Sequence, residues 1–569
     1  MFTCTTLVDG LQKRAEQSGN KPAFIFRDKY GGRCVLPWQQ IYRLGGRWAA
    51  VLKTGSVGRG HLVLNTLPNS PERVIVETGI LLSGAASVNG QCQLADGSDL
   101  LHGLHVSRAR AIVLDPDVPN SPWKVLEKLV NLDEDGSVTS EELPHLKLVY
   151  FVRRGEKGDD EDFLTHLENL SDWYQADVKP DDVMAVFTTS GSTGFSKLVV
   201  HTHDRWVNIN LSSADMMDAS HDHVDLALAP LGWIGGYPGF TILSGYPRVL
   251  CDVRGGGLPK DVPDFLWKCV QEERCTRVFI LPVFLSRVAE LARQRRQEGA
   301  RAETVFTSTY TEEAEGSLDM TKWSWVPEIC FLGGMPITRS MVKTAKSLAK
   351  NVVVLYGATD FSVISSHVVH DPDTFVDHDA GLVVKEAQVK IVDTEDENVI
   401  LPVGQVGNIL AKRPGMMREY LNNPQATADA FTADGFFRTG DVGSLDARGH
   451  LIVAGRGSDA IMRGPYIFYP GWLEARIRAC PGVSDVLVVG VPDPFLHEEL
   501  CACVVLTSDH VTTQHVREFV ERDIVTTEDD PLSPRPRYYL RFESFPMTDT
   551  DKPRRKVVKK QAAVRLGVN

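Results

Sequence analysis

The sequence predicts an α/β protein with a large N-terminal domain, built around mostly parallel sheets, and a small α+β C-terminal domain. The length of 569 residues exceeds what a single hydrophobic core usually organises, so we expect at least two domains. The middle of the chain alternates short apolar runs with helical patterns. After about residue 455 this pattern changes.

Four apolar runs in the middle of the chain are typical of buried strands, because Gly, Pro or charged residues bound each run. They span 225–230, 276–282, 328–333 and 351–356. Apolar residues between them recur at helical spacing, as in 265–270 and 341–349. This alternation predicts a parallel sheet covered on both faces, with ligands beyond the carboxyl ends of its strands.

The segment after residue 455 has its own order of elements. A glycine-rich stretch at 455–464 precedes a predicted helix at 472–479, two apolar strand-like runs at 484–491 and 500–506, and a helix at 513–522. We therefore predict two domains, 1–455 and 456–569.

The composition is that of an ordinary globular protein, with 43% hydrophobic and 24% charged residues. The formal net charge of −13 argues against nucleic-acid binding along the whole chain. No stretch reaches the ~20 apolar residues that cross a bilayer, and the N-terminus lacks a signal-peptide pattern. We expect no nucleic-acid partner, no transmembrane segment and a cytoplasmic location. Cys501 and Cys503 are expected to share the buried face of one strand.

A loop of glycine and hydroxyl residues, TTSGSTGFSK at 188–197, lies between two apolar runs. Glycine lets backbone N–H groups approach phosphate oxygens, and the lysine adds positive charge. The spacing differs from that of the P-loop motif. A flexible hairpin connection is the alternative interpretation. The phosphate-binding candidates are Thr189, Ser190, Gly191, Ser192, Thr193, Gly194 and Lys197.

With this loop, the sequence resembles the adenylate-forming superfamily of acyl-CoA synthetases, amino-acid-adenylating domains and firefly-type luciferases. The segments that resemble the family's motifs, in the expected order, are TSGSTGFSK at 189–197, GGMP at 333–336, YGATD at 356–360, FRTGD at 437–441, GRGSD at 455–459 and PMTDTDK at 546–552. The resemblance implies several subdomains in the N-terminal domain and a mobile C-terminal domain.

The resemblance also implies a reaction in two steps. A small-molecule carboxylic acid attacks the α-phosphate of ATP in the presence of Mg²⁺, giving acyl-AMP and pyrophosphate. Coenzyme A then displaces AMP and forms acyl-CoA. Because the first step joins two anions, it needs charge neutralisation and in-line positioning.

Positions that match the family's motifs have implied roles. Thr189, Lys197 and Lys552 would be catalytic, with Lys552 bridging the acid and the α-phosphate. Further nucleotide contacts would come from Gly334, Met335, Pro336, Tyr356, Gly357, Thr359, Asp360, Asp441 and Arg456. Asp360 would also bind Mg²⁺, and Ser458 would be the hinge between the domains. The acyl pocket would be lined by Trp233, Gly235, Gly334 and Gly357.

Several of these residues have a simpler interpretation. Asp441 follows a Thr-Gly turn and could be a turn former, and Lys552 begins a basic run of the kind that is usually a solvated face. Trp233 stands where many family members have His. A tryptophan there resembles the short- and medium-chain acyl-CoA synthetases and would limit chain length, whereas core packing is the alternative.

Other positions depart from the family's pattern. Asp360 replaces a common Glu, Ser458 a Lys or Asp, and Met462 a Lys. Asp551 replaces a Gly and adds a negative charge beside the expected catalytic lysine.

Three other functions are compatible with the motifs. An amino-acid-adenylating protein is disfavoured, because the segment 230–240 contains no acid to pair with a substrate ammonium group. A luciferase-like oxygenase needs no new motif. A non-catalytic binder of nucleotide or acyl ligands would explain Asp551 and Ser458, but Lys197, Asp441 and Lys552 are retained.

Overall fold

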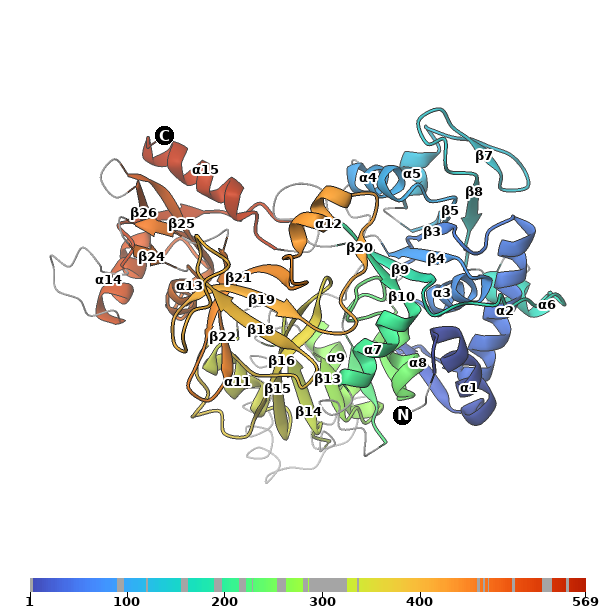
Figure 1. The fold of residues 1–569 in the computed structure, drawn as a ribbon, viewed down its shortest axis with the longest axis horizontal. Helices are drawn as coiled ribbons and strands as arrows, with labels where there is room; N and C mark the ends of the chain where they lie inside the picture. Colours follow the sequence, from blue (N-terminus) through green and yellow to red (C-terminus); the bar gives the residue numbers. More distant parts are fainter. Residues whose placement is uncertain are drawn as a thin grey trace, which may run out of the picture.

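The structure is a computed structural model of the 569-residue chain. Two large sheets and a smaller C-terminal sheet form its framework (Figure 1). The residues that the structure describes are 4–89, 97–118, 121–154, 162–188, 197–213, 222–227, 229–252, 262–279, 285, 325–334, 337–457, 461–463, 466–468, 470–493, 497–523, 535–548 and 552–568.

The larger sheet contains the four predicted strands of the middle of the chain as parallel neighbours β11, β13, β14 and β15. Among the described residues it has 13 strands, in the order β18 (Gln388–Val392), β19 (Gly407–Lys412), β21 (Phe437–Leu445), β22 (His450–Arg456), β17 (Asp379–Val383), β16 (Ser362–Val369), β15 (Asn351–Ala358), β14 (Ile329–Leu332), β13 (Arg277–Phe279), β11 (Asp225–Ala227), β12 (Arg248–Cys251), β1 (Pro22–Arg27) and β2 (Arg33–Pro37).

The two halves of this sheet differ in strand direction for a physical reason. All four residues of β14 and of β12 are buried, as expected for parallel strands covered on both faces. From β15 to β18 every neighbouring pair is antiparallel. Several of these pairs are joined by short turns, such as 359–361 between β15 and β16, and a short turn can join only antiparallel strands. The pattern of apolar runs in the sequence did not distinguish this antiparallel half from the parallel one.

The second large sheet lies on the right of Figure 1. Strands β9, β4, β3, β5 and β8 are parallel neighbours, whereas β10 is antiparallel to both β9 and β20. In the described chain its order is β20 (Glu419–Tyr420), β10 (Leu198–Thr202), β9 (Val183–Thr188), β4 (Ala86–Asn89), β3 (Leu62–Asn65), β5 (Ala111–Leu114) and β8 (Leu148–Phe151). A separate hairpin pairs β6 (Asn131–Leu132) with β7 (Val138–Thr139).

Helix α3 (Pro71–Ser83) is buried along its whole length. It begins where Ser70 Oγ accepts a hydrogen bond from the backbone N–H of Arg73, and it ends at Gly84, whose φ of +77° suits glycine. The other helices of the N-terminal part are α1 (Leu7–Ser18), α2 (Trp38–Thr54), α4 (Ser98–Ser107), α5 (Trp123–Leu126), α6 (Phe163–Asn169), α7 (His203–Ser213), α8 (Pro238–Ser244), α9 (Val262–Glu272), α11 (Arg339–Lys346) and α12 (Pro424–Ala430).

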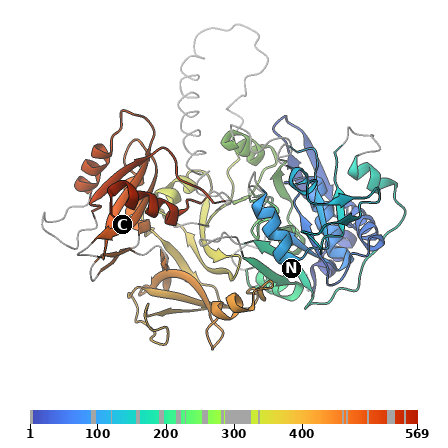
Figure 2. The same ribbon diagram turned by 90° about the horizontal axis from the view of Figure 1, so that it is seen from above.

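The C-terminal elements form a separate α+β layer, seen in red in Figure 2. Their described strands are β24 (Tyr466–Phe468), β23 (Ile461–Arg463), β26 (His497–Leu506) and β25 (Val483–Asp493), with β27 (Tyr538–Phe542) beside β26. Their helices are α13 (Pro470–Arg478), α14 (Thr513–Asp523) and α15 (Arg555–Leu566). Cys501 and Cys503 are both buried on β26, as predicted. The exact boundary at 455/456 stays a prediction.

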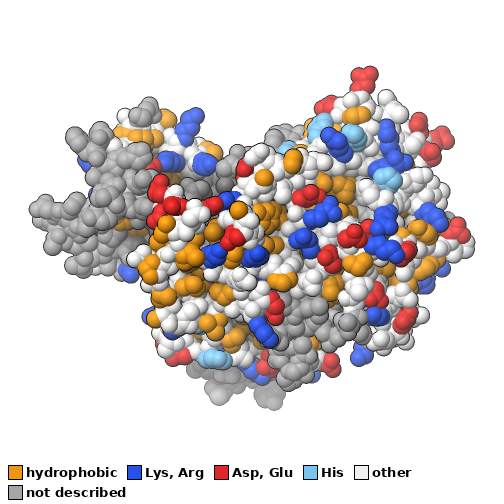
Figure 3. All heavy atoms as spheres, viewed as in Figure 1, with side chains coloured by type: hydrophobic (Ala, Val, Ile, Leu, Met, Phe, Trp, Pro, Cys, Tyr) orange, Lys and Arg blue, Asp and Glu red, His pale blue; other side chains and the backbone are white. Residues whose placement is uncertain are grey.

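Charged residues of both signs are interspersed over the described surface on the face shown in Figure 3. Among the described helices, none is both long enough and apolar enough to cross a membrane.

Candidate active site

The motif residues of the middle of the chain meet at one edge of the larger sheet. Strands β11, β14 and β15 run parallel, so the segments after their carboxyl ends emerge together. Gly334 follows β14 with a φ of +83°, a conformation that L-residues rarely adopt. At Gly357, a Cβ atom would lie 2.4 Å from the carbonyl oxygen of Ser362, so only glycine lets the β15–β16 hairpin close this tightly.

The phosphate loop joins two antiparallel strands. Thr188 at the end of β9 pairs with Leu198 at the start of β10, so the two ends of the loop lie side by side. Lys197 is exposed at the second end. The loop therefore begins and ends on a rigid frame, even though its central candidates, Thr189, Ser190, Gly191, Ser192, Thr193 and Gly194, lie outside the described residues.

Tyr420 connects Lys197 to Asp360. The Lys197 ammonium lies over the Tyr420 ring, 4.4 Å from its centroid. The phenol of the same tyrosine donates a hydrogen bond of 2.5 Å to Asp360 Oδ1. Tyr420 reaches this position because β20 pairs with β10, with Tyr420 opposite Val199. One aromatic side chain thus holds a cation of one motif and a carboxylate of another, 163 positions apart in sequence number (360 − 197).

Asp441 is buried and faces the same edge. The Tyr356 hydroxyl donates a 2.6 Å hydrogen bond to Asp441 Oδ2, and the backbone N–H of Asp441 donates to Thr439 Oγ1 at 3.1 Å. Asp441 on β21 is the register partner of Arg456 on β22. These contacts fix the carboxylate beside Tyr356, which places two predicted nucleotide residues in direct contact.

The predicted acyl segment is packed on an aromatic cluster formed by Phe187, Trp206, Tyr237 and Phe240. Phe187 and Trp206 stack with centroids 5.7 Å apart, and Tyr237 meets both rings edge-on at 5.1 Å. Since Phe187 lies on β9, this cluster couples the acyl segment to the strand that carries the phosphate loop.

Within this segment, neighbouring positions differ in exposure. Trp233 is half-buried, whereas Leu231 and Tyr237 are buried in the main apolar core. The backbone N–H of Trp233 donates a hydrogen bond to the Pro230 carbonyl at 2.9 Å, and the Trp233 carbonyl accepts one from the Gly236 N–H at 3.0 Å. Gly235 is exposed, and a Cβ atom there would meet no other atom within 4 Å. Trp233 thus sits at a turn above the core.

His201, Tyr237 and Tyr420 belong to this region, although no sequence motif indicated them. His201 lies on β10, and its Nε2 is 3.0 Å from the carbonyl oxygen of Thr359. Burial lowers the pKa of His201 to about 4, so its imidazole is neutral at physiological pH. An apolar strand with one His at its end gives no sequence signal for such a contact, because its partner comes from a distant turn.

Lys552 is exposed in a turn just before α15. Its backbone N–H donates to Thr548 Oγ1 at 3.1 Å, and its carbonyl accepts from the Thr548 N–H at 2.7 Å. The interpretation of the whole basic run as solvated was wrong at Arg555, because this residue lies on the inner side of α15. Its guanidinium pairs with Glu474 at 2.5 Å and donates to the Val488 carbonyl at 2.6 Å.

The remaining candidates lie wholly or in part outside the residues that the structure describes. Met335, Pro336, Ser458 and Asp551 lie outside the described residues, as do the side chains of Arg456 and Met462. Their predicted roles stay predictions.

Residues 11–421 match the family model of the AMP-binding enzymes, and residues 473–552 match that of the AMP-binding enzyme C-terminal domain. The chain therefore belongs to the AMP-binding enzyme family, that is, the adenylate-forming superfamily, and to its acyl-CoA synthetase branch. Its α/β fold with a smaller C-terminal domain is the fold of this superfamily.

Two relatives illustrate the similarity in sequence. The long-chain-fatty-acid–CoA ligase FadD13 of Mycobacterium tuberculosis is 26% identical over 489 residues, which cover 85% of this chain and 86% of the relative. The human mitochondrial acyl-coenzyme A synthetase ACSM3 is 24% identical over 572 residues, covering 97% and 87%.

Solved structures share the fold. The crystal structure of ATP-bound MatB from Rhodopseudomonas palustris superposes with a TM-score of 0.76 at 20% identity, covering 99% of both chains. The anthranilate CoA ligase AuaEII in complex with anthranoyl-AMP gives a TM-score of 0.77 at 19% identity, covering 99% of this chain and 98% of that one.

Proposed function

We propose that this protein activates a hydrophobic carboxylic acid as acyl-AMP at the expense of ATP and then transfers the acyl group to coenzyme A. The observation that carries the proposal is the contact of Lys197 and Asp360 with opposite parts of Tyr420. It brings the cation at the end of the phosphate loop close to the expected metal ligand.

The first step brings a carboxylate to the α-phosphate while pyrophosphate departs. Lys197 and the donors of the phosphate loop would bind the β- and γ-phosphates, and Thr359 would contact the α-phosphate. Asp441, which accepts a hydrogen bond from the Tyr356 hydroxyl, would also accept hydrogen bonds from the ribose hydroxyls. Donors fixed in advance favour such a step, because they need no reorganisation when charge moves to the leaving group.

The side chain of Asp360 suits Mg²⁺. It is an oxygen ligand, it is oriented by the Tyr420 hydroxyl, and it lies near the residue expected to bind phosphate. Mg²⁺ usually binds one or two carboxylates together with substrate phosphates. When bound, the ion would neutralise phosphate charge.

Lys552 would bridge the acid and the α-phosphate during adenylation. The C-terminal elements lie at the left of Figure 1, whereas β9 and β10 lie to the right of its centre. We therefore propose that adenylation requires rotation of the C-terminal domain, with Ser458 as the hinge. Withdrawal of Lys552 would then open the site to coenzyme A.

The acid is proposed to be of short or medium length. Trp233 is half-buried above the apolar core, which supports a position on the pocket wall rather than within the core. Gly235, Gly334 and Gly357 would leave room for the acyl chain near the nucleotide. A cytoplasmic location stays part of this proposal.

The test is pyrophosphate release from ATP and Mg²⁺ with a panel of C2 to C16 acids and amino acids, followed by detection of the thioester when coenzyme A is added. Release with a subset of acids and formation of acyl-CoA are expected. Release with amino acids alone would indicate an amino-acid-adenylating protein, and release without thioester would indicate another acceptor. No release with any acid would support a non-catalytic binder.

The Lys552→Ala variant separates the two steps. We expect adenylation to fall by roughly 10²–10³-fold, which is typical for loss of one group that stabilises transition-state charge. Thioester formation from supplied acyl-adenylate should survive. Lys556→Ala is the matched control, because Lys556 is also exposed and lies in the same basic run. Equal loss of both steps in Lys552→Ala would contradict the role of this lysine.

A further inference from the structure

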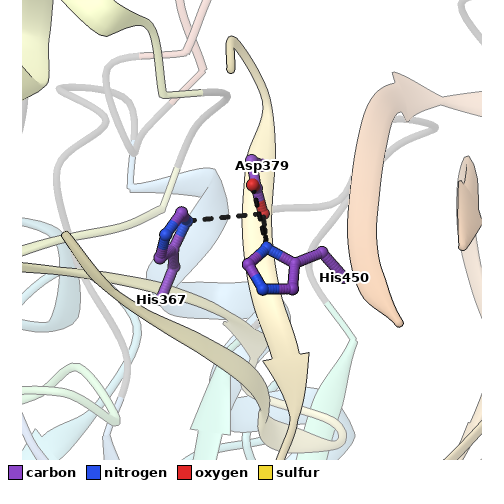
Figure 4. A group of neighbouring side chains, drawn as sticks. All are labelled: His367, Asp379 and His450. Carbon is purple, nitrogen blue, oxygen red and sulfur yellow. Dashed lines mark hydrogen bonds and ion pairs between the residues drawn. The ribbon is translucent and has the colours of Figure 1, made fainter. Parts of the chain in front are cut away.

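Two histidines and an aspartate gather on three neighbouring strands of the larger sheet. Asp379 begins the central strand β17, His367 lies on β16, and His450 begins β22 (Figure 4). In the figure a nitrogen of each imidazole ring is joined to the carboxylate by a dashed line, and the two rings lie edge to face with their centroids 4.9 Å apart. None of these residues belongs to the nucleotide or acyl motifs.

Their ligand atoms are close enough to share one ion. Nδ1 of His450 lies 2.9 Å from Oδ2 and 3.0 Å from Oδ1 of Asp379, and Nδ1 of His367 lies 3.4 Å from Oδ1. One ligand atom from each residue can be chosen so that all lie within 4.8 Å of one another. Tetrahedral bonds of about 2.0–2.2 Å to nitrogen and oxygen need ligand atoms only a few ångströms apart.

The backbone makes room for this arrangement at Gly381. Its φ is +81°, and a Cβ atom there would lie 2.5 Å from the His367 Cβ and 2.1 Å from the Ser366 carbonyl oxygen. A side chain at this position would therefore push β16 and His367 away from the carboxylate. The Gly381 N–H also donates to Asp379 Oδ1 at 2.8 Å, which helps to orient that oxygen.

The burial and the hydrogen bonds of Asp379 and His367 suit metal coordination. Asp379 is fully buried, and its carboxylate lies 2.9 Å from Nδ1 of His450 and accepts hydrogen bonds from the Gly381 N–H and from Arg448. Nδ1 of His367 is buried and has no hydrogen-bond partner among the described residues. A buried ring nitrogen aimed at a carboxylate without a good hydrogen bond is explained if both bind a third group.

The net charge of the cluster and the contacts around it also suit a bound cation. Asp379, Asp446 and Arg448 sum to −1 when the histidines are neutral, so the cluster can accept a cation. Arg448 donates to Asp379 Oδ2 at 2.9 Å and pairs with Asp446 at 2.7 Å. Ligating carboxylates are commonly hydrogen-bonded from outside in this way. The His367 and His450 side chains are 16% and 14% exposed, which gives an ion access from solvent.

We propose that His367, Asp379 and His450 form a binding site for a divalent transition-metal ion of the zinc class. Two imidazole nitrogens and one carboxylate oxygen are a typical zinc donor set, whereas Mg²⁺ prefers oxygen ligands. Because the protein supplies three ligands, a water molecule would occupy the fourth coordination position of the ion. The ion ties β16, β17 and β22 together.

This site is separate from the proposed nucleotide site. His450 and Arg456 are the two ends of β22, and six residues of strand span roughly 20 Å. The metal therefore acts on the stability of the sheet rather than on the chemistry of adenylation.

The test uses the full-length chain without a histidine tag, stripped with a chelator and titrated with Zn²⁺ by calorimetry. We expect one ion per chain, with affinity reduced by roughly 100-fold or more in His450→Gln and His367→Gln, because even outer-shell partners contribute about 10–100-fold. His370→Gln is the matched control, since His370 is exposed just beyond β16 and outside the cluster. Zn²⁺ should also raise the unfolding temperature of the wild type and of the control.

A second measurement does not depend on the variants. Co²⁺ added to the stripped wild-type chain should give the intense visible absorption of a four- or five-coordinate site, and Zn²⁺ should abolish it in equimolar amount. Zn²⁺ binding that survives both histidine substitutions would overturn the proposal. So would a wild-type chain that binds neither ion, because the cluster would then be a hydrogen-bonded ion pair alone.

Discussion

Replacing Tyr420 with phenylalanine removes the hydroxyl group that donates a hydrogen bond to Asp360. The phenylalanine ring would still lie under the Lys197 ammonium, so the cation–π contact at 4.4 Å is kept. The hydrogen bond to Asp360 Oδ1 is lost. The variant therefore isolates how the phenol orients the expected metal ligand.

The magnitude follows from the charge of the acceptor. A hydrogen bond to an ionised group contributes about 1.5–3 kcal/mol. At about 1.4 kcal/mol per factor of ten, this corresponds to roughly 10–100-fold. We expect the Mg²⁺ concentration at half-maximal rate to rise by about this factor, with kcat/KM for ATP falling in parallel, whereas KM for the acid should change little.

The assay is ATP–pyrophosphate exchange measured over a range of Mg²⁺ concentrations. Tyr30→Phe is the control, because Tyr30 is 84% exposed. Tyr420→Leu should be more impaired than Tyr420→Phe, since it also removes the ring beneath Lys197, a contact that contributes about 0.5–2 kcal/mol. If Tyr420→Phe keeps the Mg²⁺ dependence of the wild type within twofold, the phenol does not orient Asp360 for metal binding.

Two further predictions concern packing and pH. Gly236→Ala should destabilise the acyl segment by a few kcal/mol, because its Cβ would lie 2.0 Å from the Pro230 carbonyl oxygen. At Gly235 a Cβ would meet no atom within 4 Å. The Gly235→Ala variant should therefore unfold at the wild-type temperature and alter only KM for the acid. The pKa values of His201 and His203 are lowered by burial to about 4. In the unfolded chain these histidines titrate at about pH 6.5, so below that pH the unfolded state binds more protons than the folded state. The stability that the neutral histidines contribute above about pH 6.5 is therefore lost as the pH falls toward 4. At pH 5 the loss is about 2 kcal/mol per histidine. The urea midpoint should therefore drop between pH 7 and 5, less steeply in His203→Gln, and a midpoint independent of pH would contradict this account.

The sequence predicted the elements that depend on local patterns. The four central strands are found as β11, β13, β14 and β15, and the predicted C-terminal helices as α13 and α14. These elements could be predicted because a run of apolar side chains bounded by Gly or Pro carries its own signal. The edge at which Gly334 and Tyr356 meet follows from the parallel direction of their strands.

Contacts between distant segments could not be predicted in this way. Nothing near Tyr420 indicates that it lies between Lys197 and Asp360, because that position depends on the pairing of β20 with β10. The His367, Asp379 and His450 cluster was missed for the same reason. Its members lie on three strands, and their juxtaposition depends on the bare backbone at Gly381.

The pairing of β20 with β10 also has a consequence during synthesis of the chain. Among the described strands, β10 can pair only with β9 until residue 420 leaves the ribosome, and its other edge can meanwhile pair with any extended peptide nearby. A nascent chain at that stage also lacks the aromatic ring that contacts the lysine of the phosphate loop. We therefore expect fragments that end before residue 419 to aggregate, and to bind ATP weakly even when they stay folded.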